Sequence, residues 1–532
     1  MSAEVRDPYR EHGWWRDETF LDDLRRFARE TPDRPALISH RDGEDRVVSY
    51  AELASLTENC AIRLAELGVG PGDVVAVQLP NWWELLPLGL ACARIGAIFS
   101  PLLIIYRRRE LDFVLRLTEA KVVVTMGEWE GVRLGDVVAE LAAGLPSPPH
   151  VLVAGQPGAR FFEDFFFGSP AVAGEVPPGA ELGPDDPFLL LFTSGTTGES
   201  KGVLHSQNTL FASASAYADV LGQDADTVAF ISHVATHYSG FVTGMLTSLL
   251  RGGSTLILGV WDAPTFVEVA PRYGATTFYG APNFLVDLLA AQQASPGDLS
   301  SLRYVISGSA PIPPLVLERI RAVFDAKVVA LWGMTENGAT TITRPDDPPD
   351  WAEHSDGSPL GGMEIRIDTS VVPASEDGSG LFLVRGPSQC LGYFKREALY
   401  ASCLDADGWF DTGDLARPDG RGGIRITGRI KDVIVAKAIN VPVTEVEDAL
   451  LRHPLVKDAA VVGVPTESDE LVCAVVVPRG EAPSLDSLRE HLTGEGFSDL
   501  FLPGRLELLG ELPRTVTGKV RKVELRAQFA GT

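Results

Sequence analysis

Short β-rich runs alternate with helical segments along the first two thirds of the chain. Residues 73–78 (DVVAVQ) and 121–125 (KVVVT) are β-rich, whereas residues 52–67 and 83–94 have the pattern of helices. A second series of the same kind follows between residues 188 and 331. Strands that alternate with helices at this spacing predict a mainly parallel α/β sheet.

The last third of the chain changes character twice. From about residue 357, short β runs with glycine turns (MEIRID, GSGLFLVRG, GGIRITGR) predict an antiparallel sheet or barrel. After Gly428, helical and strand-like segments alternate in a block about the size of a small independent domain. We therefore expect a large N-terminal part, residues 1–430, and a small C-terminal domain, residues 431–532.

The charge balance limits the partners of the chain. It has 46 Lys and Arg against 72 Asp and Glu, a formal net charge of −26, which repels phosphate backbones and anionic lipid. We expect neither nucleic acid nor membrane as a partner, although a local pocket can still hold a small anion. The five cysteines form no CxxC pair, and the apolar stretches are interrupted by Arg94 and Arg251. These features favour a reduced, cytoplasmic location.

A segment rich in glycine and hydroxyl groups follows the apolar run FLLLF. It comprises three glycines, several hydroxyl residues and one lysine within residues 192–202. Glycine permits tight turns that direct backbone N–H groups inward, and lysine adds a positive charge. Together they can hold a polyphosphate, although the spacing differs from a GxxxxGK[ST] loop. The alternative is a flexible polar turn. The candidates for phosphate binding are Thr193, Ser194, Gly195, Thr196, Thr197, Gly198 and Lys201.

Two further motifs follow strand-like runs. Glu336, after the run VVAL, can hold Mg²⁺ together with phosphate oxygens, Thr335 can bond a phosphate, and Trp332 can stack on a base. The alternatives are a solvated acid for Glu336 and a core or rim aromatic for Trp332. The second motif repeats the pattern of a strand followed by small residues. These two motifs contribute Trp332, Gly333, Met334, Thr335 and Glu336, and Ser307, Gly308, Ser309, Ala310 and Pro311.

Three charged residues stand out in the last quarter of the chain. Asp414, in GWFDTGD, can accept two hydrogen bonds from a vicinal diol. Arg429 lies where the domain character changes, and Lys519 lies on a glycine-containing turn from which it can project. The alternatives are a turn acid and solvated basic side chains.

Taken together, the motifs resemble those of the adenylate-forming superfamily: acyl- and aryl-CoA synthetases, firefly-type luciferases and peptide-synthetase adenylation domains. They occur in the family's order and approximate spacing over essentially the full chain. The segments YREHGWWRD and QLPNWWE are most similar to CoA ligases for medium-chain or alicyclic acids. The resemblance implies two α/β subdomains, a β-barrel and a small mobile C-terminal α+β lid, with its hinge at Lys431.

The resemblance also implies a two-step reaction that uses ATP, Mg²⁺ and coenzyme A. A carboxylic acid attacks the α-phosphate of ATP to form an acyl-adenylate and pyrophosphate. The lid then rotates and the CoA thiol displaces AMP. The residue types suit this chemistry, because phosphoryl transfer depends on positioning and electrostatics.

The resemblance assigns roles to individual residues. Lys519 bridges the carboxylate and the α-phosphate, Glu336 and Thr335 hold the metal and α-phosphate, and Asp414 and Arg429 hold the ribose. His237 corresponds to the family position near the substrate carboxylate, with His233 as its rival; either can instead be a satisfied core histidine. Small residues in the adenine and acyl region allow a bulky or alicyclic apolar acid. A homodimer is a further expectation.

One loop departs from the family pattern. Lys437 and Ala438 replace a Gly-Gly pair that normally follows the hinge, and side chains there crowd a loop that approaches pantetheine. This leaves three alternatives besides a complete ligase: a specialist for one half-reaction that accepts a pre-made acyl-adenylate, an enzyme that loads a carrier protein, and an inactive nucleotide-binding homologue.

Overall fold

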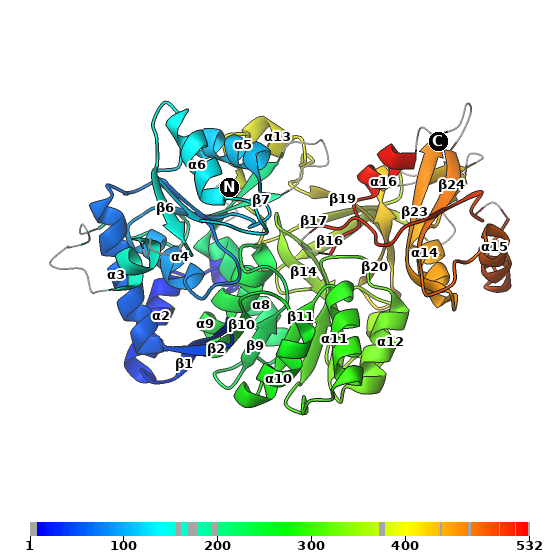
Figure 1. Cartoon of the computed structure of the whole chain (residues 1–532), viewed down its shortest axis with the longest axis horizontal. Helices are drawn as coiled ribbons and strands as arrows, with labels where there is room; N and C mark the ends of the chain where they lie inside the picture. The colour runs from blue at the N-terminus through cyan, green and yellow to red at the C-terminus, as the bar shows by residue number, and fades with distance from the viewer. Residues whose placement is uncertain are drawn as a thin grey trace.

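The structure is a computed structural model. It describes residues 8–155, 161–168, 176, 179–193, 200–371, 378–432, 434–436, 439–465, 470–499, 501–515 and 518–529. A large part built on two α/β layers lies beside a smaller C-terminal domain, and an antiparallel sheet lies between them (Figure 1).

The first α/β layer is a sheet with strand order β18-β8-β7-β4-β3-β5-β6. Its central strands pair in parallel, and β8 forms an antiparallel hairpin with β7. Every residue of β3 and β5 is buried, as in a parallel sheet covered on both faces. The strands are β3 (Val74–Gln78), β4 (Ile98–Pro101), β5 (Val122–Met126), β6 (His150–Ala154), β7 (Pro187–Thr193), β8 (Lys201–Ser206) and β18 (Gly392–Tyr393). The helices that accompany it in the chain are α2 (Phe20–Glu30), α3 (Tyr50–Glu66), α4 (Leu85–Arg94), α5 (Arg108–Thr118), α6 (Leu134–Ala143) and α13 (Glu397–Ala401).

The second layer is a longer sheet with order β15-β14-β13-β12-β11-β9-β10-β1-β2. Strands β13, β12, β11, β9, β10 and β1 pair in parallel, so their carboxyl ends share one edge. The strands are β1 (Pro35–Arg41), β2 (Glu44–Ser49), β9 (Val228–Ile231), β10 (Ser254–Leu258), β11 (Thr277–Gly280), β12 (Tyr304–Ser307), β13 (Lys327–Met334), β14 (Gly338–Ile342) and β15 (Ser358–Pro359). The helices of this region are α8 (Gln207–Val220), α9 (Thr247–Arg251), α10 (Ala263–Tyr273), α11 (Pro282–Ala294), α12 (Pro314–Val323) and the π-helix Ser239–Leu246.

The third sheet leads into the small domain. Strands β16 (Glu364–Asp368), β17 (Gly380–Arg385), β19 (Phe410–Pro418) and β20 (Ile424–Arg429) pair antiparallel. The small domain has a core of its own, in which helix α14 packs on strand β23. Its elements are β21 (Ile434–Ala436), β22 (Ile439–Val441), α14 (Val443–Arg452), β23 (Val456–Pro465), β24 (Glu470–Pro478), α15 (Leu485–Gly494), β25 (Arg505–Leu508) and α16 (Lys522–Phe529).

The predicted fold class is confirmed, with one difference inside the first layer. Residues 144–187 are rich in proline and glycine, which predicts a surface loop with short strands. The structure shows that they also contain the helical turns Phe161–Glu163 and Asp164–Gly168. Phe162 and Phe166 in these turns are fully buried. The Asn59 side chain on α3 donates a hydrogen bond to the Phe166 carbonyl at 2.5 Å. The aromatic run FFEDFFF therefore packs into the core, a feature that the proline and glycine content of the segment obscures.

Candidate active site

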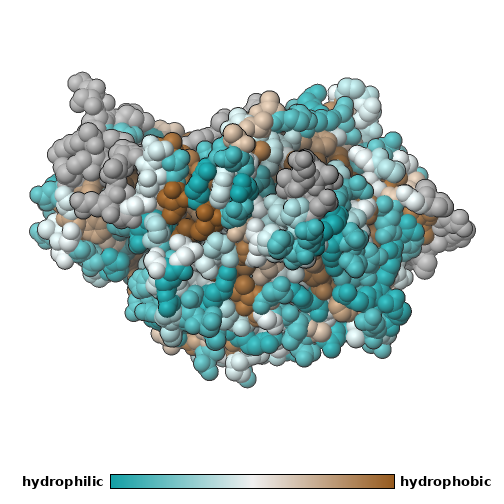
Figure 2. Space-filling view, turned by 180° about the vertical axis from the view of Figure 1, so that it is seen from behind, coloured by the Kyte–Doolittle hydropathy of each residue, from teal (hydrophilic) through white to brown (hydrophobic). Residues whose placement is uncertain are grey.

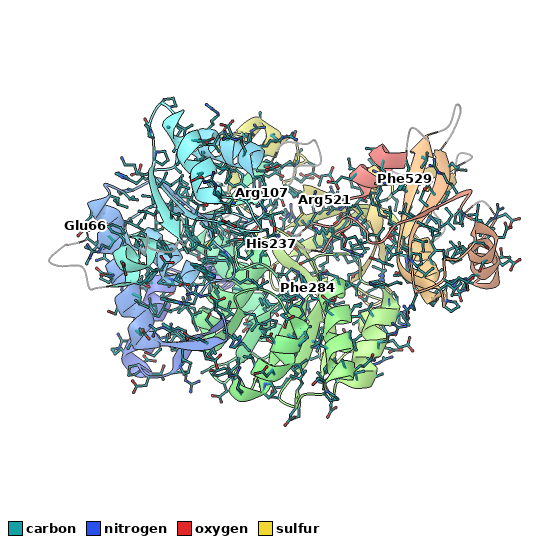
Figure 3. All side chains as sticks on the ribbon, viewed as in Figure 1. Glu66, Arg107, His237, Phe284, Arg521 and Phe529 are labelled. Atoms are coloured by element: carbon teal, nitrogen blue, oxygen red, sulfur yellow. The ribbon has the colours of Figure 1, made fainter. Side chains whose placement is uncertain are left out.

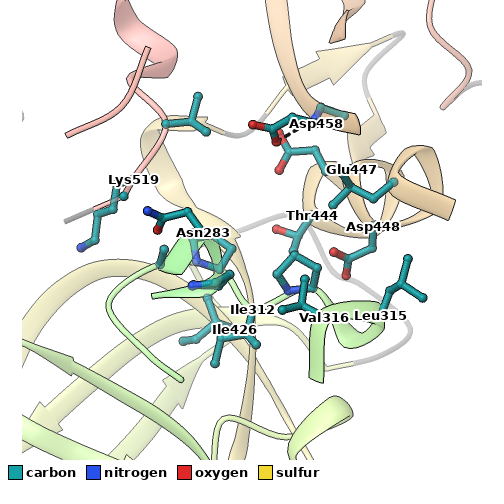
Figure 4. Close-up of a pocket in the computed structure, with 18 of the residues that line it drawn as sticks. Asn283, Ile312, Leu315, Val316, Ile426, Thr444, Glu447, Asp448, Asp458 and Lys519 are labelled. Atoms are coloured by element: carbon teal, nitrogen blue, oxygen red, sulfur yellow. Dashed lines mark hydrogen bonds between the residues drawn. The ribbon is translucent and has the colours of Figure 1, made fainter. Parts of the chain in front are cut away.

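A cavity of about 1210 Å³ separates the large part from the small domain. Helices α11 and α12, the ends of β13 and β20, and helix α14 line it. In Figure 4, Lys519 and Asn283 lie together at one end of the cavity, and Glu447 and Asp448 on α14 lie at the other. From behind, the surface is largely hydrophilic, and apolar residues show mainly in hollows (Figure 2). The cavity lies at the carboxyl ends of parallel strands, where open α/β sheets bind ligands.

Two glycines bring backbone close to the wall of this cavity. A Cβ on Gly308 would lie 2.6 Å from the Leu331 carbonyl oxygen, and one on Gly333 would lie 2.3 Å from the Gly338 carbonyl oxygen. Side chains at these positions would therefore collide with backbone. Ser309, Ala310 and Pro311 continue the same wall, together with Trp332. We refer to this part of the cavity, between residues 309–311 and Gly333 of β13, as the slot.

Ser307 and Ser309 differ in their surroundings. Ser307 ends strand β12, is fully buried, and its hydroxyl has no hydrogen-bond partner among the described residues. Ser309 adopts a positive φ of 68° and its hydroxyl shares a hydrogen bond of 3.1 Å with the Tyr279 hydroxyl. Tyr279, which the sequence did not single out, thus fixes the turn after β12.

Asp414 is held by two partners beside the slot. Trp332 Nε1 donates to Asp414 Oδ2 at 2.9 Å, and Arg429 Nε lies 2.7 Å from Asp414 Oδ1. Asp414 on β19 and Arg429 on β20 are cross-strand partners. Trp332 also packs edge-on against Phe382 at a centroid distance of 4.7 Å. The indole therefore has a structural contact as well as a place in the cavity wall, as expected for a core or rim aromatic. Its stacking on a base stays a prediction.

Glu336 and Lys201 are connected through a tyrosine. Tyr393 donates its hydroxyl proton to Glu336 Oε1 at 2.9 Å, and Lys201 Nζ donates to the same hydroxyl at 3.4 Å. Burial, and next the charge of Glu336, raise the pKa of Tyr393, so its hydroxyl stays protonated and acts as a donor. Tyr393 is on β18, nearly 60 residues further along the chain than Glu336. No local pattern in the sequence points to this contact.

A buried histidine supports the neighbouring threonine. His205 Nε2 donates to the Thr335 carbonyl oxygen at 2.7 Å, and His205 Nδ1 lies 2.9 Å from Thr209 Oγ1. Burial lowers the pKa of His205 to about 4, so the ring is neutral and one nitrogen donates while the other accepts. Thr335 and Glu336 are both buried, at 7% and 6% exposure. His205 thus positions the backbone of the motif that carries them.

Lys519 reaches the same region from the small domain. Its pKa is lowered to about 8 by burial, and next by the charge of Arg429, while Asp414 and Glu336 act in the opposite direction. Lys519 lines the same cavity as Asp414 and Arg429 of the large part. A Cβ on Gly518 would lie 2.1 Å from Asn283 Oδ1, so the turn that carries Lys519 rests directly on the start of α11.

Two histidines follow strand β9. His237 Nδ1 shares a hydrogen bond of 3.0 Å with Ser239 Oγ, and its ring lies near the centre of the molecule (Figure 3). His233 is 1% exposed, and neither ring nitrogen has a partner among the described residues. Burial, and to a lesser degree the charge of Lys519, lower the pKa of His237 to about 4 and that of His233 to about 3, where the charge of His237 also contributes. Both imidazoles are neutral at physiological pH.

Several predicted site residues have limited or no description in the structure. Thr193 ends β7 and pairs with Lys201 at the start of β8, which brings the two ends of the phosphate-loop segment together. Lys431 lies in a short 3-10 turn, Ile430–Asp432. Met334 is partly buried at the end of β13. Outside the described residues lie Ser194, Gly195, Thr196, Thr197, Gly198, Lys437 and Ala438.

The described residues contain neither a metal-binding cluster nor a membrane-spanning helix. Within them, no group of three or more His, Cys, Asp or Glu side chains can hold a metal ion. A magnesium site made by one carboxylate and substrate phosphates needs no such group. The helices in the part of the chain that the structure covers include none long and apolar enough to span a bilayer.

The cavity lies between the two parts of the chain, and the small domain supplies one of its walls. A family model described as AMP-binding enzyme matches residues 24–394, and one described as AMP-binding enzyme C-terminal domain matches residues 445–519. The chain belongs to the AMP-binding enzyme family, which confirms the predicted membership of the adenylate-forming superfamily.

Relatives cover almost the whole chain. A medium-chain fatty-acid–CoA ligase of Escherichia coli is 31% identical over 534 residues, 99% of this chain and 93% of that protein. A CoA ligase of Mycobacterium tuberculosis for a methyl-dioxo-octahydroindenyl propanoate is 33% identical, over 94% of this chain and 97% of that one. The solved structure of ATP-bound MatB from Rhodopseudomonas palustris aligns with a TM-score of 0.83 at 29% identity, over 97% of this chain and 99% of that one. The predicted enzyme class, an AMP-forming acid–CoA ligase, agrees with these relatives.

Proposed function

We propose that this protein activates a carboxylic acid with ATP to an acyl-adenylate and then transfers the acyl group to coenzyme A. The observation that carries the proposal is the position of Lys519, which comes from the small domain yet lines the same cavity as Trp332, Asp414 and Arg429 of the large part. A cation placed there meets the negative charge that develops during attack on a phosphate.

The residues at the cavity fit ATP. The slot between the Ser309–Pro311 wall and the β13 backbone at Gly333 suits adenine, and the orphaned Ser307 hydroxyl lies at its edge. Asp414, held in place by Trp332 and Arg429, accepts hydrogen bonds from the ribose hydroxyls. The segment 193–201 holds the β- and γ-phosphates by way of backbone N–H groups and Lys201.

Glu336 would hold Mg²⁺ through its carboxylate, with phosphate oxygens and water completing the shell. When bound, the ion neutralises charge on the phosphates and on the departing pyrophosphate. Tyr393 keeps the carboxylate in position for this role. Thr335, fixed by His205, contributes its hydroxyl to the α-phosphate.

The first half-reaction begins with the ionised carboxylate of the acid. Its oxygen attacks the α-phosphorus, and the bond to the bridging oxygen of pyrophosphate breaks. Lys519 stabilises the charge on both the attacking and the phosphate oxygens. His237, a neutral imidazole oriented by Ser239, lies at the acid end of the site.

The second half-reaction needs a free path to the acyl carbonyl. With Lys519 inside the site, the small domain occupies that path, so the domain turns about Lys431 to admit the pantetheine thiol. The sulfur then attacks the acyl carbon and AMP leaves. Lys437 and Ala438, which replace the Gly-Gly pair of the family, belong to the loop that approaches pantetheine in this step. A specialist for one half-reaction is therefore the alternative to a complete ligase.

The acid is bulky and cyclic in our proposal, because the wall residues Ser309, Ala310 and Gly333 are small. The aromatic ring of Tyr279 adjoins them through its hydrogen bond to Ser309. A cytoplasmic location and a homodimer remain predictions. A relative of Mycobacterium tuberculosis, 32% identical over 527 residues, is named salicyl-AMP ligase and salicyl-S-ArCP synthetase. Because of this relative, a carrier protein is the alternative acceptor of the acyl group in our proposal.

The experiment is a screen of carboxylic acids by ATP–pyrophosphate exchange, followed by thioester formation with free CoA. Exchange with a defined acid and its conversion to an acyl-CoA support the proposal. Exchange without thioester points to a carrier protein, and thioester only from synthetic acyl-AMP points to the specialist. Tight AMP binding with no turnover of any acid refutes acid activation.

A further inference from the structure

The loop after strand β9 holds a buried imidazole with no protein partner. His233 is 1% exposed, and both ring nitrogens lack a hydrogen-bond partner among the described residues. A buried polar group that stays unpaired costs free energy, so such groups in native proteins usually meet water or a ligand. His205, also fully buried, has a partner for each nitrogen. The difference marks His233 as a group kept available.

The position of His233 is fixed by its surroundings. The Asn81 side chain donates to the His233 carbonyl oxygen at 3.4 Å and accepts from the Ala235 amide at 2.7 Å, so one amide pins the loop on both sides of the ring. The ring packs between Tyr279, at a centroid distance of 5.0 Å, and Phe284, at 5.5 Å. It cannot turn toward solvent without breaking these contacts.

His233 also adjoins the cavity where the acid lies in the proposed function. Tyr279, which packs against the His233 ring, hydrogen-bonds to Ser309 in the cavity wall, so one side chain links His233 to that wall. Strands β9, β11 and β12 are neighbours in the sheet, and β12 ends at Ser307, whose hydroxyl is also buried without a partner. Unpaired polar atoms therefore gather at adjoining strand ends, in surroundings that are otherwise aromatic and small.

We propose that His233 binds an uncharged hydrogen-bonding group of the acyl moiety, so that the preferred substrate is a ring-bearing carboxylic acid with a hydroxyl or ring carbonyl group. A neutral imidazole offers one donor and one acceptor, which matches either group. This proposal rests on the proposed activation of a carboxylic acid. It narrows the expected substrates from bulky or alicyclic apolar acids to those that carry a polar group on the ring.

The test compares pairs of acids that differ by one polar group. Cyclohexanecarboxylate with its hydroxy and oxo derivatives, and benzoate with the hydroxybenzoates, are assayed by ATP–pyrophosphate exchange. We expect the wild type to favour one substituted acid by tenfold or more in kcat/KM, because a site that pairs a polar group discriminates against its absence. His233→Leu should remove that preference, so that the ratio of kcat/KM for the substituted acid to kcat/KM for the unsubstituted acid falls to about one. His150→Leu, at an exposed position on β6, is the matched control.

A second measurement uses the protein without substrate. Since the ring nitrogens are unpaired, His233→Leu should keep or raise the Tm; a clear fall in Tm identifies a structural histidine satisfied by water and overturns the proposal. An unchanged acid preference in His233→Leu also overturns it, while leaving acid activation intact. Absence of exchange with every acid refutes the proposed function, and this inference falls with it.

Discussion

Replacing Gly518 with alanine should block the adenylating position of the small domain while leaving the other position available. Gly518 has a φ of +82°, a region that costs a residue with a Cβ about 1–2 kcal/mol. The new Cβ would also lie 2.1 Å from Asn283 Oδ1, so the Asn283 side chain must move at a further cost of about 1 kcal/mol, as for an off-rotamer side chain. When the small domain is not docked against α11, the turn around residue 518 can relax. The penalty of about 2–3 kcal/mol thus applies to docking, and adenylation should fall roughly 30- to 150-fold.

Two assays separate docking from general damage. ATP–pyrophosphate exchange reports adenylation, and thioester formation from synthetic acyl-AMP and CoA reports the second step. Gly518→Ala with Asn283→Ala should recover only the part of the loss that comes from the collision. Gly510→Ala is the matched control, because a Cβ there meets nothing within 4 Å. Equal losses in both assays, or full adenylation by Gly518→Ala, would refute the reasoning.

Three further predictions concern ionisable groups. Because Lys519 has a pKa lowered to about 8 and acts as a cation, pyrophosphate exchange should decline as the pH rises through 8, and flattening of that profile in Lys519→Arg checks the assignment. Tyr393→Phe removes the donor to Glu336, so a Mg²⁺ titration of exchange should need about tenfold more metal, whereas Tyr400→Phe should not change the titration. Burial raises the pKa of Asp448 to about 7. Between the usual carboxyl pKa and pH 7, the folded protein therefore keeps a proton on Asp448 that the unfolded chain has released, and the free energy of unfolding falls as the pH rises through this range. Asp448→Asn should therefore raise the Tm more at pH 8 than at pH 4, and an equal effect at both values would contradict the assignment.

The large-scale organisation could be predicted because it depends on local periodicity. Strands β3 and β5 and helices α3 and α4 lie within a residue or two of the runs expected from the sequence. Their apolar residues recur with the period of a strand or helix, which burial imposes directly. The aromatic turns at Phe161–Gly168 were missed because proline and glycine around them suggested a surface loop.

The site could be predicted only where function concentrates in short segments. Asp414 and Lys519 could be proposed as site residues because their motifs are local, and both line the cavity. Tyr393, His205 and Asn283 could not be proposed, because each acts through a contact with a residue distant in the chain. Sequence spacing carries no information on such contacts until the sheet order is known. The unpaired state of His233 likewise becomes visible only when every neighbouring donor and acceptor has a position.

The most direct test of the account is the ratio of the two half-reactions in Lys519→Ala. The small-domain lysine serves acyl-adenylate formation alone, so pyrophosphate exchange should fall by at least 10²-fold, as for loss of one group that stabilises developing charge. Thioester formation from synthetic acyl-AMP and CoA should stay within a few-fold of wild type. A similar fall in both reactions would contradict the account, because it would mean that Lys519 supports the fold or the second step and not the attack on ATP.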